Sequence, residues 1–408
     1  MSPDWTIGQW HAALARLVDA AHLERPDGLG VVLQEAVRPL GIETTVYVVD
    51  REQRMLRALP APGRPPRDPL SIDSTLPGRA FATVSVLPSM DPPVRLWVPV
   101  VDGTERLGVL DVVLPDDADP ADPGLHEGAT LLAGLIGHVL MAKSVYGDSL
   151  HVARRSRPMS VAAELLWQML PPLTFITEGM VLSAVLEPCY DVGGDAFDYA
   201  VDGPVTRMAV FDSVGHGLPA ALTSAVALSA TRSCRRSGGD LVEIARAADE
   251  AIAQQFPDFS FATAVLAELE NEHGVLRYVN AGHPAPLLLR HGRAVLECDE
   301  GRRVPLGLAS MMPEPVAVEP AEQALEPGDR LLFYTDGVTE ARNRDGEPFG
   351  LARLVDLAER ISAELPAAET LRRLCHATLE FQPDQLGDDA TLMLVEWSPD
   401  AVAQNLPE

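Results

Sequence analysis

Carboxylates at a few positions between 195 and 389 could do chemistry together. Each follows an apolar run or lies in a glycine-bearing turn, where a side chain can project into a cleft. These residues are Asp195, Asp212, Asp336 and the pair Asp388-Asp389. Carboxylates aimed at one cleft repel one another strongly at low dielectric, so bound cations are needed to make the arrangement tolerable. Oxygen-only ligands indicate a hard divalent ion, Mg²⁺ or Mn²⁺.

Each aspartate taken alone has a more ordinary interpretation. Most Asp-Gly sequences cap a helix or fill a turn, and short motifs give many false matches. The shared context of all four positions favours a common site.

The elements that must position these carboxylates are short strands separated by tight turns. Apolar or β-branched runs occupy 181–186, 206–211, 261–269, 275–280, 286–290, 293–297, 330–335 and 391–397. Turn sequences such as His291-Gly292 between consecutive runs predict hairpins and antiparallel sheet. Predicted helix pairs interrupt the strands at 218–235 with 241–256 and at 351–361 with 368–381. Helices segregated from antiparallel strands predict an α+β fold.

The first part of the sequence predicts a separate α/β unit. Helical spacing, a strand, a hairpin and a second helix are expected at 6–37, 44–49, 95–114 and 129–145. A further helix, 161–170, is ended by Pro171-Pro172. We therefore predict a first domain over 1–147, a connector over 148–172, a second domain over 173–398 and a polar tail over 399–408.

Composition excludes several classes of protein. The net charge is −27, which argues against nucleic-acid binding because that needs a basic surface. Hydrophobic residues at 47% and charged residues at 22% are typical of a globular protein.

The cysteines show no CxxC spacing, and we expect them to be reduced. With no signal peptide, and with the apolar segment 129–142 shorter than the roughly 20 residues that a membrane span needs, we expect a cytoplasmic protein without a membrane segment.

Six motifs follow one another in the order found in SpoIIE-type serine phosphatases, the bacterial branch of the metal-dependent type 2C (PPM) phosphatases. They are Val192-Gly193-Gly194-Asp195, Asp212-Ser213-Val214-Gly215-His216-Gly217, Asn280-Ala281-Gly282-His283-Pro284, Pro327-Gly328-Asp329, Tyr334-Thr335-Asp336-Gly337-Val338-Thr339-Glu340 and Asp388-Asp389-Ala390-Thr391. The resemblance covers about 162–396. It implies an αββα sandwich of two antiparallel sheets flanked by helix pairs, with two Mn²⁺ or Mg²⁺ ions at one end.

The resemblance also implies a role for each residue. Asp212 resembles the carboxylate that bridges both ions, and the backbone carbonyl of Ser213 resembles the adjoining ligand. Asp195 resembles a ligand of the second ion. Asp336 and Asp388 resemble ligands of the first ion, and Asp389 is a further candidate beside them. Asp198 is a candidate contact of a metal-bound water. In this scheme a metal-activated water attacks phosphorus, and the protein supplies no nucleophile.

The sequence departs from the eukaryotic relatives in two places. Val214 stands where those relatives have a histidine that can act as general acid, and no phosphate-binding arginine occurs near Val192. His216, in the same motif as Val214, is a candidate acid, as is His283 in the Asn280–Pro284 motif, and each has a structural alternative in which it bonds the backbone.

The N-terminal region resembles a GAF domain through Pro77-Gly78-Arg79-Ala80-Phe81 and the hairpin from Leu96 to Leu110. That implies a ligand of unknown identity, although a packing module without a ligand is the alternative. Helices 129–145 and 165–170 suit a homodimer, and a helix near 163–170 resembles a switch that couples such a sensor to the metal site. The family resemblance implies a phosphorylated STAS-type anti-sigma factor antagonist as the substrate. An inactive pseudophosphatase and a hydrolase of small phosphoesters are the alternatives.

Overall fold

The chain divides into two compact units. The structure, a computed structural model, describes residues 5–60, 65–191, 193–256, 260–362, 365–382 and 388–398. The division falls after Arg157, inside the predicted connector. The predicted tail 399–408 and Val192 lie outside the described residues.

The N-terminal unit is built on one antiparallel sheet with the strand order β3-β2-β1-β6-β5-β4. Its strands are β1 (Glu43–Val49), β2 (Met55–Ala58), β3 (Leu70–Ser71), β4 (Leu87–Ser89), β5 (Arg95–Asp102) and β6 (Glu105–Val113). The predicted hairpin 95–114 is β5 and β6, which pair over their whole length.

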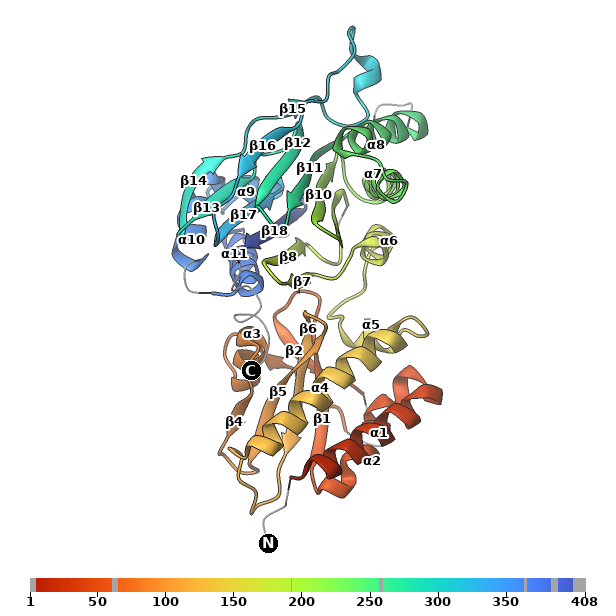
Figure 1. Ribbon diagram of the computed structural model, residues 1–408, viewed down its shortest axis with the longest axis vertical. Helices are drawn as coiled ribbons and strands as arrows, with labels where there is room; N and C mark the ends of the chain where they lie inside the picture. Colours follow the sequence, from red (N-terminus) through yellow and green to blue (C-terminus); the bar gives the residue numbers. More distant parts are fainter. Residues whose placement is uncertain are drawn as a thin grey trace. The chain divides into compact units, whose positions relative to one another are not determined.

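Helices cover both faces of this sheet. The helical elements are α1 (Ile7–Leu23), η1 (Pro26–Gly28), α2 (Leu29–Val37), η2 (Arg38–Leu40), α3 (Leu76–Thr83), α4 (Pro123–Ser144) and α5 (Ser149–Ala153). Side chains of α1, α2 and α4 share one apolar core with the sheet, while α3 packs in a second core around Phe81 and Trp97. Figure 1 shows α4, in yellow, running across the sheet beside α1.

The long apolar helix α4 corrects one expectation. The segment 129–142 is only part of it, because Asp122 caps the helix by accepting the Leu125 N–H at 3.0 Å, and the helix therefore begins at Pro123. At this length and composition α4 could cross a membrane, so the exclusion by length is wrong. A core helix of a soluble protein passes the same test, and Leu125, Leu132 and Leu140 pack into the core against the sheet.

The C-terminal unit contains two six-stranded sheets. One has the order β14-β13-β17-β18-β8-β7, and the other has the order β15-β12-β11-β10-β9 with β16 also paired to β12. The strands are β7 (Thr174–Thr177), β8 (Met180–Glu187), β9 (Asp195–Asp202), β10 (Val205–Ser213), β11 (Ala262–Glu270), β12 (Val275–Ala281), β13 (Leu287–Arg290), β14 (Arg293–Glu297), β15 (Arg302–Arg303), β16 (Ala321–Ala324), β17 (Asp329–Tyr334) and β18 (Ala390–Trp397). All the pairings are antiparallel except that of β12 with β15.

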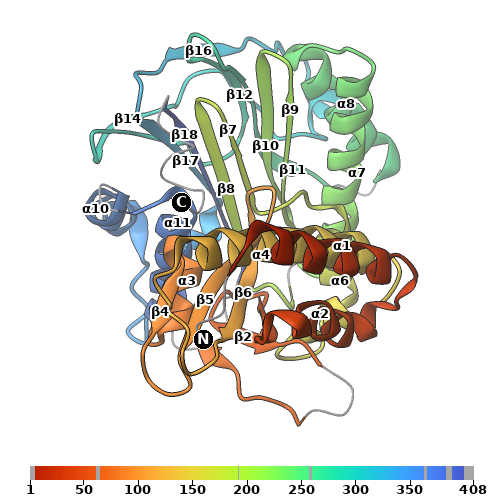
Figure 2. The same cartoon turned by 60° about the horizontal axis from the view of Figure 1, so that its bottom comes forward.

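Helix pairs cover the outer faces of the two sheets. The helices are α6 (Val161–Met169), α7 (Leu218–Arg236), α8 (Leu241–Gln255), η3 (Ala309–Met311), α9 (Asp336–Glu340), α10 (Gly350–Ser362) and α11 (Ala367–Phe381). Helices α7 and α8 share a core with β9, β10 and β11, and α10 and α11 share one with β8, β17 and β18. Figure 2 shows the resulting order of layers, with the green helices on one side and the blue helices on the other. The predicted αββα sandwich is confirmed.

Alternation along the strands fills the space between the sheets. Met208 and Val210 of β10 lie in the core between the two sheets, whereas Ala209 and Phe211 face α7 and α8. Because successive side chains point to opposite faces, even-numbered residues of β10 project between the sheets. The four cysteines are free, as expected, and all but Cys234 are buried.

Gly337 lets the two segments that carry Asp336 and Asp389 approach each other. A Cβ atom added at Gly337 would lie 1.9 Å from the backbone carbonyl oxygen of Asp389, so a larger residue forces the backbone to shift. We expect Gly337→Ala to destabilise the protein by about 2 kcal/mol, measured by thermal unfolding. The control is Gly134→Ala in α4, where the added Cβ meets nothing within 4 Å. Equal melting temperatures for the two variants would contradict the close approach.

Candidate functional site

Strand alternation brings the predicted carboxylates to one end of the sandwich. Asp212 lies two positions after Val210 on β10 and therefore points to the same face of the sheet. Asp195 likewise lies two positions before Phe197 on β9. Both residues therefore project between the sheets, where the inward-facing apolar residues end. Asp195 and Asp212 are also direct partners in the β9–β10 register. Two carboxylates opposite each other on neighbouring strands are destabilising unless something neutralises them.

The other sheet supplies the remaining carboxylates to the same end. Asp336 begins α9 immediately after β17, and Asp388 and Asp389 precede β18, which pairs with β17. Asp389 is buried, Asp336 is partly buried and Asp388 is exposed. The site thus draws on both sheets of the sandwich.

The raised pKa values of these aspartates show that their charges act on one another. Burial, followed by the charges of Asp336, Asp388 and Asp389, raises the pKa of Asp212 to about 7. Burial, followed by the charges of Asp212 and Asp389, raises the pKa of Asp195 well above its usual range. Burial, followed by the charge of Asp388, likewise raises the pKa of Asp336. The carboxylates behave as one electrostatic unit.

This donor set fits a hard divalent cation in its chemistry, since it consists of carboxylate oxygens that repel one another without one. The side chains do not form a complete coordination site. In the described part of the chain no three His, Cys, Asp or Glu side chains form a group that could hold a metal ion as they stand.

Ser213 lies deep in the same corner. Its hydroxyl bonds that of Ser224 at 2.7 Å, and its backbone N–H donates to the Gly194 carbonyl at 3.2 Å. Its own carbonyl oxygen lies 2.5 Å from the place where a Cβ on Gly194 would stand. Gly194 is therefore needed for the close approach of the segment that leads into β9 to the end of β10.

Asp389 makes a different set of contacts from the other carboxylates. Its Oδ2 accepts the backbone N–H groups of Gly193 at 2.7 Å, Gly194 at 2.6 Å and Asp195 at 3.1 Å. The hydroxyl of Thr335 donates to Oδ2 of Asp195 at 2.7 Å. Hydrogen bonds from Thr335, which follows β17, and Asp389, which precedes β18, thus hold both the side chain and the backbone of Asp195.

Asp198 is not part of this corner. It lies two positions after Ala196 on β9 and therefore points, like Ala196, toward the helices. Arginines of α7 donate hydrogen bonds to both of its carboxylate oxygens. Arg232 Nη2 and Arg235 Nη1 lie 2.6 Å and 2.7 Å from its oxygens. The expectation that Asp198 contacts a metal-bound water is therefore wrong.

The two histidines differ in their surroundings. His216 is exposed in the loop between β10 and α7. His283 is buried, its Nδ1 lies 2.8 Å from the Thr263 hydroxyl, and burial lowers its pKa to about 3. A neutral imidazole bonded to a threonine indicates a structural role for His283.

Sequence reasoning missed Thr335, Arg232 and Arg235. Thr335 continues the series Leu331 and Phe333, whose side chains face the other sheet. The alternation along β17 therefore already indicated that the Thr335 side chain points between the sheets. The two arginines are spaced i, i+3 on α7, which places them on one helix face.

Crowded carboxylates predict an unusual pH dependence for the metal-free protein. Because the folded pKa of Asp212, about 7, exceeds the ordinary value, the folded state binds more protons than the unfolded state between about pH 4 and 7. Stability in EDTA should therefore fall as the pH rises through that window. Asp212→Asn should flatten the fall, and Asp356→Asn on exposed α10 should not. Identical pH dependence of the melting temperature in wild type and Asp212→Asn would contradict this.

Comparisons with known proteins agree with the architecture. Residues 202–398 match the family model described as Stage II sporulation protein E (SpoIIE). The chain is 24% identical over 220 residues to the phosphoserine phosphatase RsbU of Bacillus subtilis (strain 168), an alignment that covers 53% of this chain and 63% of RsbU. Protein IcfG of Synechocystis sp. (strain ATCC 27184 / PCC 6803 / Kazusa) is 24% identical over 221 residues, covering 47% of this chain and 34% of that protein. The chain thus spans less than two thirds of the length of these curated relatives.

Among solved structures, the RsbU and RsbW domains of a Mycobacterium tuberculosis protein match with 31% identity and a TM-score of 0.45, covering 55% of this chain and 62% of that one. The SiaA-PP2C domain of Pseudomonas aeruginosa matches with 22% identity and a TM-score of 0.49, covering 63% and 99%. By the family match, the antiparallel sandwich and the order of its acidic motifs, the C-terminal unit of this chain is similar to SpoIIE-type phosphatase domains.

Proposed function

We propose that the chain is a cytoplasmic protein serine/threonine phosphatase that depends on two Mn²⁺ or Mg²⁺ ions. The observation that carries the proposal is the convergence of Asp195, Asp212, Asp336 and Asp388 on one end of the sandwich, where burial and mutual repulsion raise the pKa values of the first three. Such a group is costly to the fold and is explained by cation binding.

Bound cations would supply an activated water and would neutralise charge on the phosphoryl group. Asp212, at the end of β10, would lie between the carboxylates of the two sheets. Asp195, on β9, would be a metal ligand from the same sheet as Asp212. Asp336 and Asp388 would complete the set of ligands from the opposite sheet. The Ser213 carbonyl is the backbone ligand in this proposal. Catalysis would need no nucleophile from the protein.

A direct test is hydrolysis of p-nitrophenyl phosphate with and without Mn²⁺. We expect activity only with the metal, and a loss of roughly 10²–10³-fold for Asp212→Asn because that carboxylate pairs with Asp195 of its own sheet and interacts with Asp336 and Asp388 of the other. The exposed Asp356→Asn variant is the matched control and should keep full activity. Turnover that survives both metal removal and Asp212→Asn would remove the proposed chemistry.

We further propose a phosphorylated STAS-type anti-sigma factor antagonist as the substrate, with phosphoserine or phosphothreonine as the group removed. The similarity to RsbU, a phosphoserine phosphatase, and to a structure that combines RsbU and RsbW domains supports this assignment. Release of phosphate from phosphorylated STAS proteins of the same genome would support it. Hydrolysis of small phosphoesters alone would favour a metabolic enzyme, and metal binding without any turnover would favour a pseudophosphatase.

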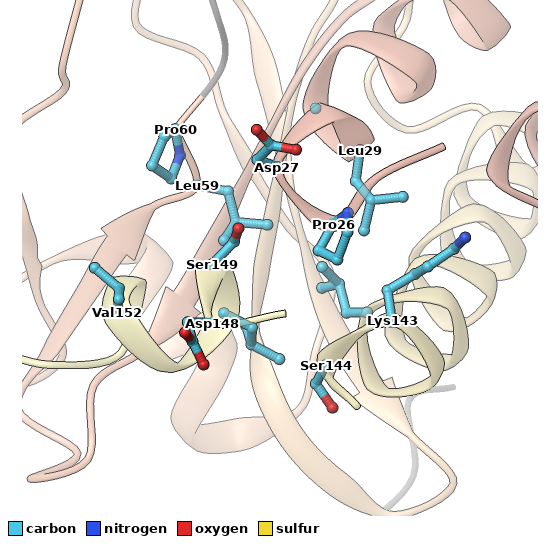
Figure 3. Close-up of a pocket in the computed structure, with 13 residues that line it drawn as sticks. Pro26, Asp27, Leu29, Leu59, Pro60, Lys143, Ser144, Asp148, Ser149 and Val152 are labelled. Atoms are coloured by element: carbon cyan, nitrogen blue, oxygen red, sulfur yellow. The ribbon is translucent and has the colours of Figure 1, made fainter. Parts of the chain in front are cut away.

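The N-terminal unit is proposed to be a GAF-like sensor. It contains a cavity of about 340 Å³ between the start of α2, the end of β2 and the α4–α5 corner, a size suited to a small molecule. Figure 3 shows Leu29, Leu59 and Pro26 around this space, while the amine of Lys143 points away from it. Lys143 instead donates to the carbonyls of His22 and Glu24 at 3.0 Å and 2.8 Å. The lining therefore suits a ligand with a largely apolar body.

The same unit is proposed to form a homodimer. Large apolar side chains are exposed on α4, where Leu131 is 56% accessible, and directly after it, where Val145 is 80% and Tyr146 81% accessible. Exposed apolar groups on and directly after a helix are typical of a protein–protein contact.

Helix α6 is proposed to transmit the state of the sensor to the site. It shares a core with α7, and Arg232 of α7 donates to the Met169 carbonyl at the end of α6 at 2.7 Å. The same guanidinium bonds Asp198, three residues after Asp195 on β9. One arginine therefore ties the connector to the strand that begins with a proposed metal ligand.

Replacing this arginine tests the coupling. Arg232→Lys keeps a positive charge beside Asp198, but a compact ammonium lacks the fork that reaches both partners. We expect the Mn²⁺ concentration for half-maximal activity to rise several-fold, whereas Arg236→Lys at the exposed end of α7 should leave it unchanged. Removal of residues 1–157 should also change this concentration or the turnover number. Wild-type values for both Arg232→Lys and the shortened chain would contradict the coupling.

A further inference from the structure

The carboxylate of Asp389 lies where the two sheets meet at the acidic corner. It precedes β18 in one sheet, and its Oδ2 faces the backbone that leads into β9 in the other. That single oxygen accepts N–H groups from Gly193, Gly194 and Asp195, and the residue is only 7% exposed. An oxygen that accepts three short N–H bonds has no lone pair left for a cation.

Thr335 makes a second contact that holds the same strand. Its hydroxyl donates to Oδ2 of Asp195 and accepts the Thr391 N–H at 2.9 Å, and the side chain is fully buried. Asp195 is therefore held at two points from the opposite sheet, at its N–H by Asp389 and at its carboxylate by Thr335. These contacts oppose the repulsion that drives Asp195 away from Asp212.

The neighbouring residue Asp388 is placed differently. It is exposed, it lies within electrostatic reach of Asp212 and Asp336, and its Oδ1 accepts the N–H of Asp389 at 2.9 Å. The two adjacent aspartates thus have separate surroundings. Oδ2 of Asp389 is occupied by three backbone donors of the other sheet, whereas Oδ1 of Asp388 accepts a backbone N–H of its own loop.

We infer that Asp389 and Thr335 are positioning residues that clamp the Gly193–Asp195 backbone across the two sheets. The inference rests on the proposed metal-dependent function. It revises the expectation that Asp389 binds a metal. The negative charge of Asp389 strengthens the three N–H bonds, and Thr335 directs the oxygens of Asp195.

Melting of the metal-free protein separates a clamp from a ligand. In EDTA we expect Asp389→Ala to lower the melting temperature clearly and Asp389→Asn to lower it less, because an amide oxygen still accepts N–H bonds. Asp388→Asn should leave the melting temperature unchanged or raise it, since it removes a repelling charge and no backbone contact across the sheets. An unchanged melting temperature for Asp389→Ala would overturn the clamp.

Calorimetric titration with Mn²⁺ gives the second readout. We expect Asp389→Asn to keep its Mn²⁺ affinity within a few-fold of wild type, and Asp388→Asn to lose about tenfold or more. Thr335→Val should weaken Mn²⁺ binding at a temperature where the fold is intact, and Thr335→Ser, which keeps the hydroxyl, should restore it. Equal loss of Mn²⁺ binding in Asp389→Asn and Asp388→Asn would overturn the inference.

These readouts stand apart from catalysis. If the wild-type chain binds Mn²⁺ but hydrolyses no phosphoester, the proposed function fails while the clamp is still decided by titration and melting. If it binds no Mn²⁺, the assignment of Asp388 as a ligand is overturned, and melting in EDTA still decides the clamp.

Discussion

Repulsion among carboxylates at the joint between two sheets is the constraint on which the C-terminal unit depends. The fold places Asp195 and Asp212 as direct neighbours on adjacent strands and adds Asp336 and Asp388 from the opposite sheet. Nothing in the apolar core favours such crowding. It is held by hydrogen bonds that cross from one sheet to the other, chiefly those of Asp389 and Thr335.

The period of two along a strand sorts the acidic residues into different roles. Asp195 and Asp198 are three positions apart on β9, so they point to opposite faces. The first meets the carboxylates between the sheets, and the second meets arginines of α7. A shift of the register by one residue would exchange these surroundings, which explains why the pairing of β9 with β10 has to be strictly defined.

Much of the C-terminal unit was predictable because its elements are locally marked. Alternating apolar runs predicted eight of the strands, and helix pairs such as 218–235 with 241–256 match α7 and α8 to within a residue. Strand β9 was missed because Gly193-Gly194 suggests a turn and because Asp198 and Asp202 interrupt the apolar pattern. Helix α3 was missed because Leu76-Pro77-Gly78 is typical of a turn, whereas Thr75 caps a helix there. The grip of Asp389 on Gly194 spans 195 positions of the sequence and has no local signature.

That long span has a consequence for how the site comes into being. The first carboxylate lies on β9, near the start of the C-terminal unit, and the last lie directly before β18, the final strand of the described chain. During synthesis the corner stays open until almost the whole unit has left the ribosome, and closing so distant a contact is slow. A nascent or prematurely ended chain therefore lacks an assembled centre, and any activity of this corner begins only once the sandwich is complete.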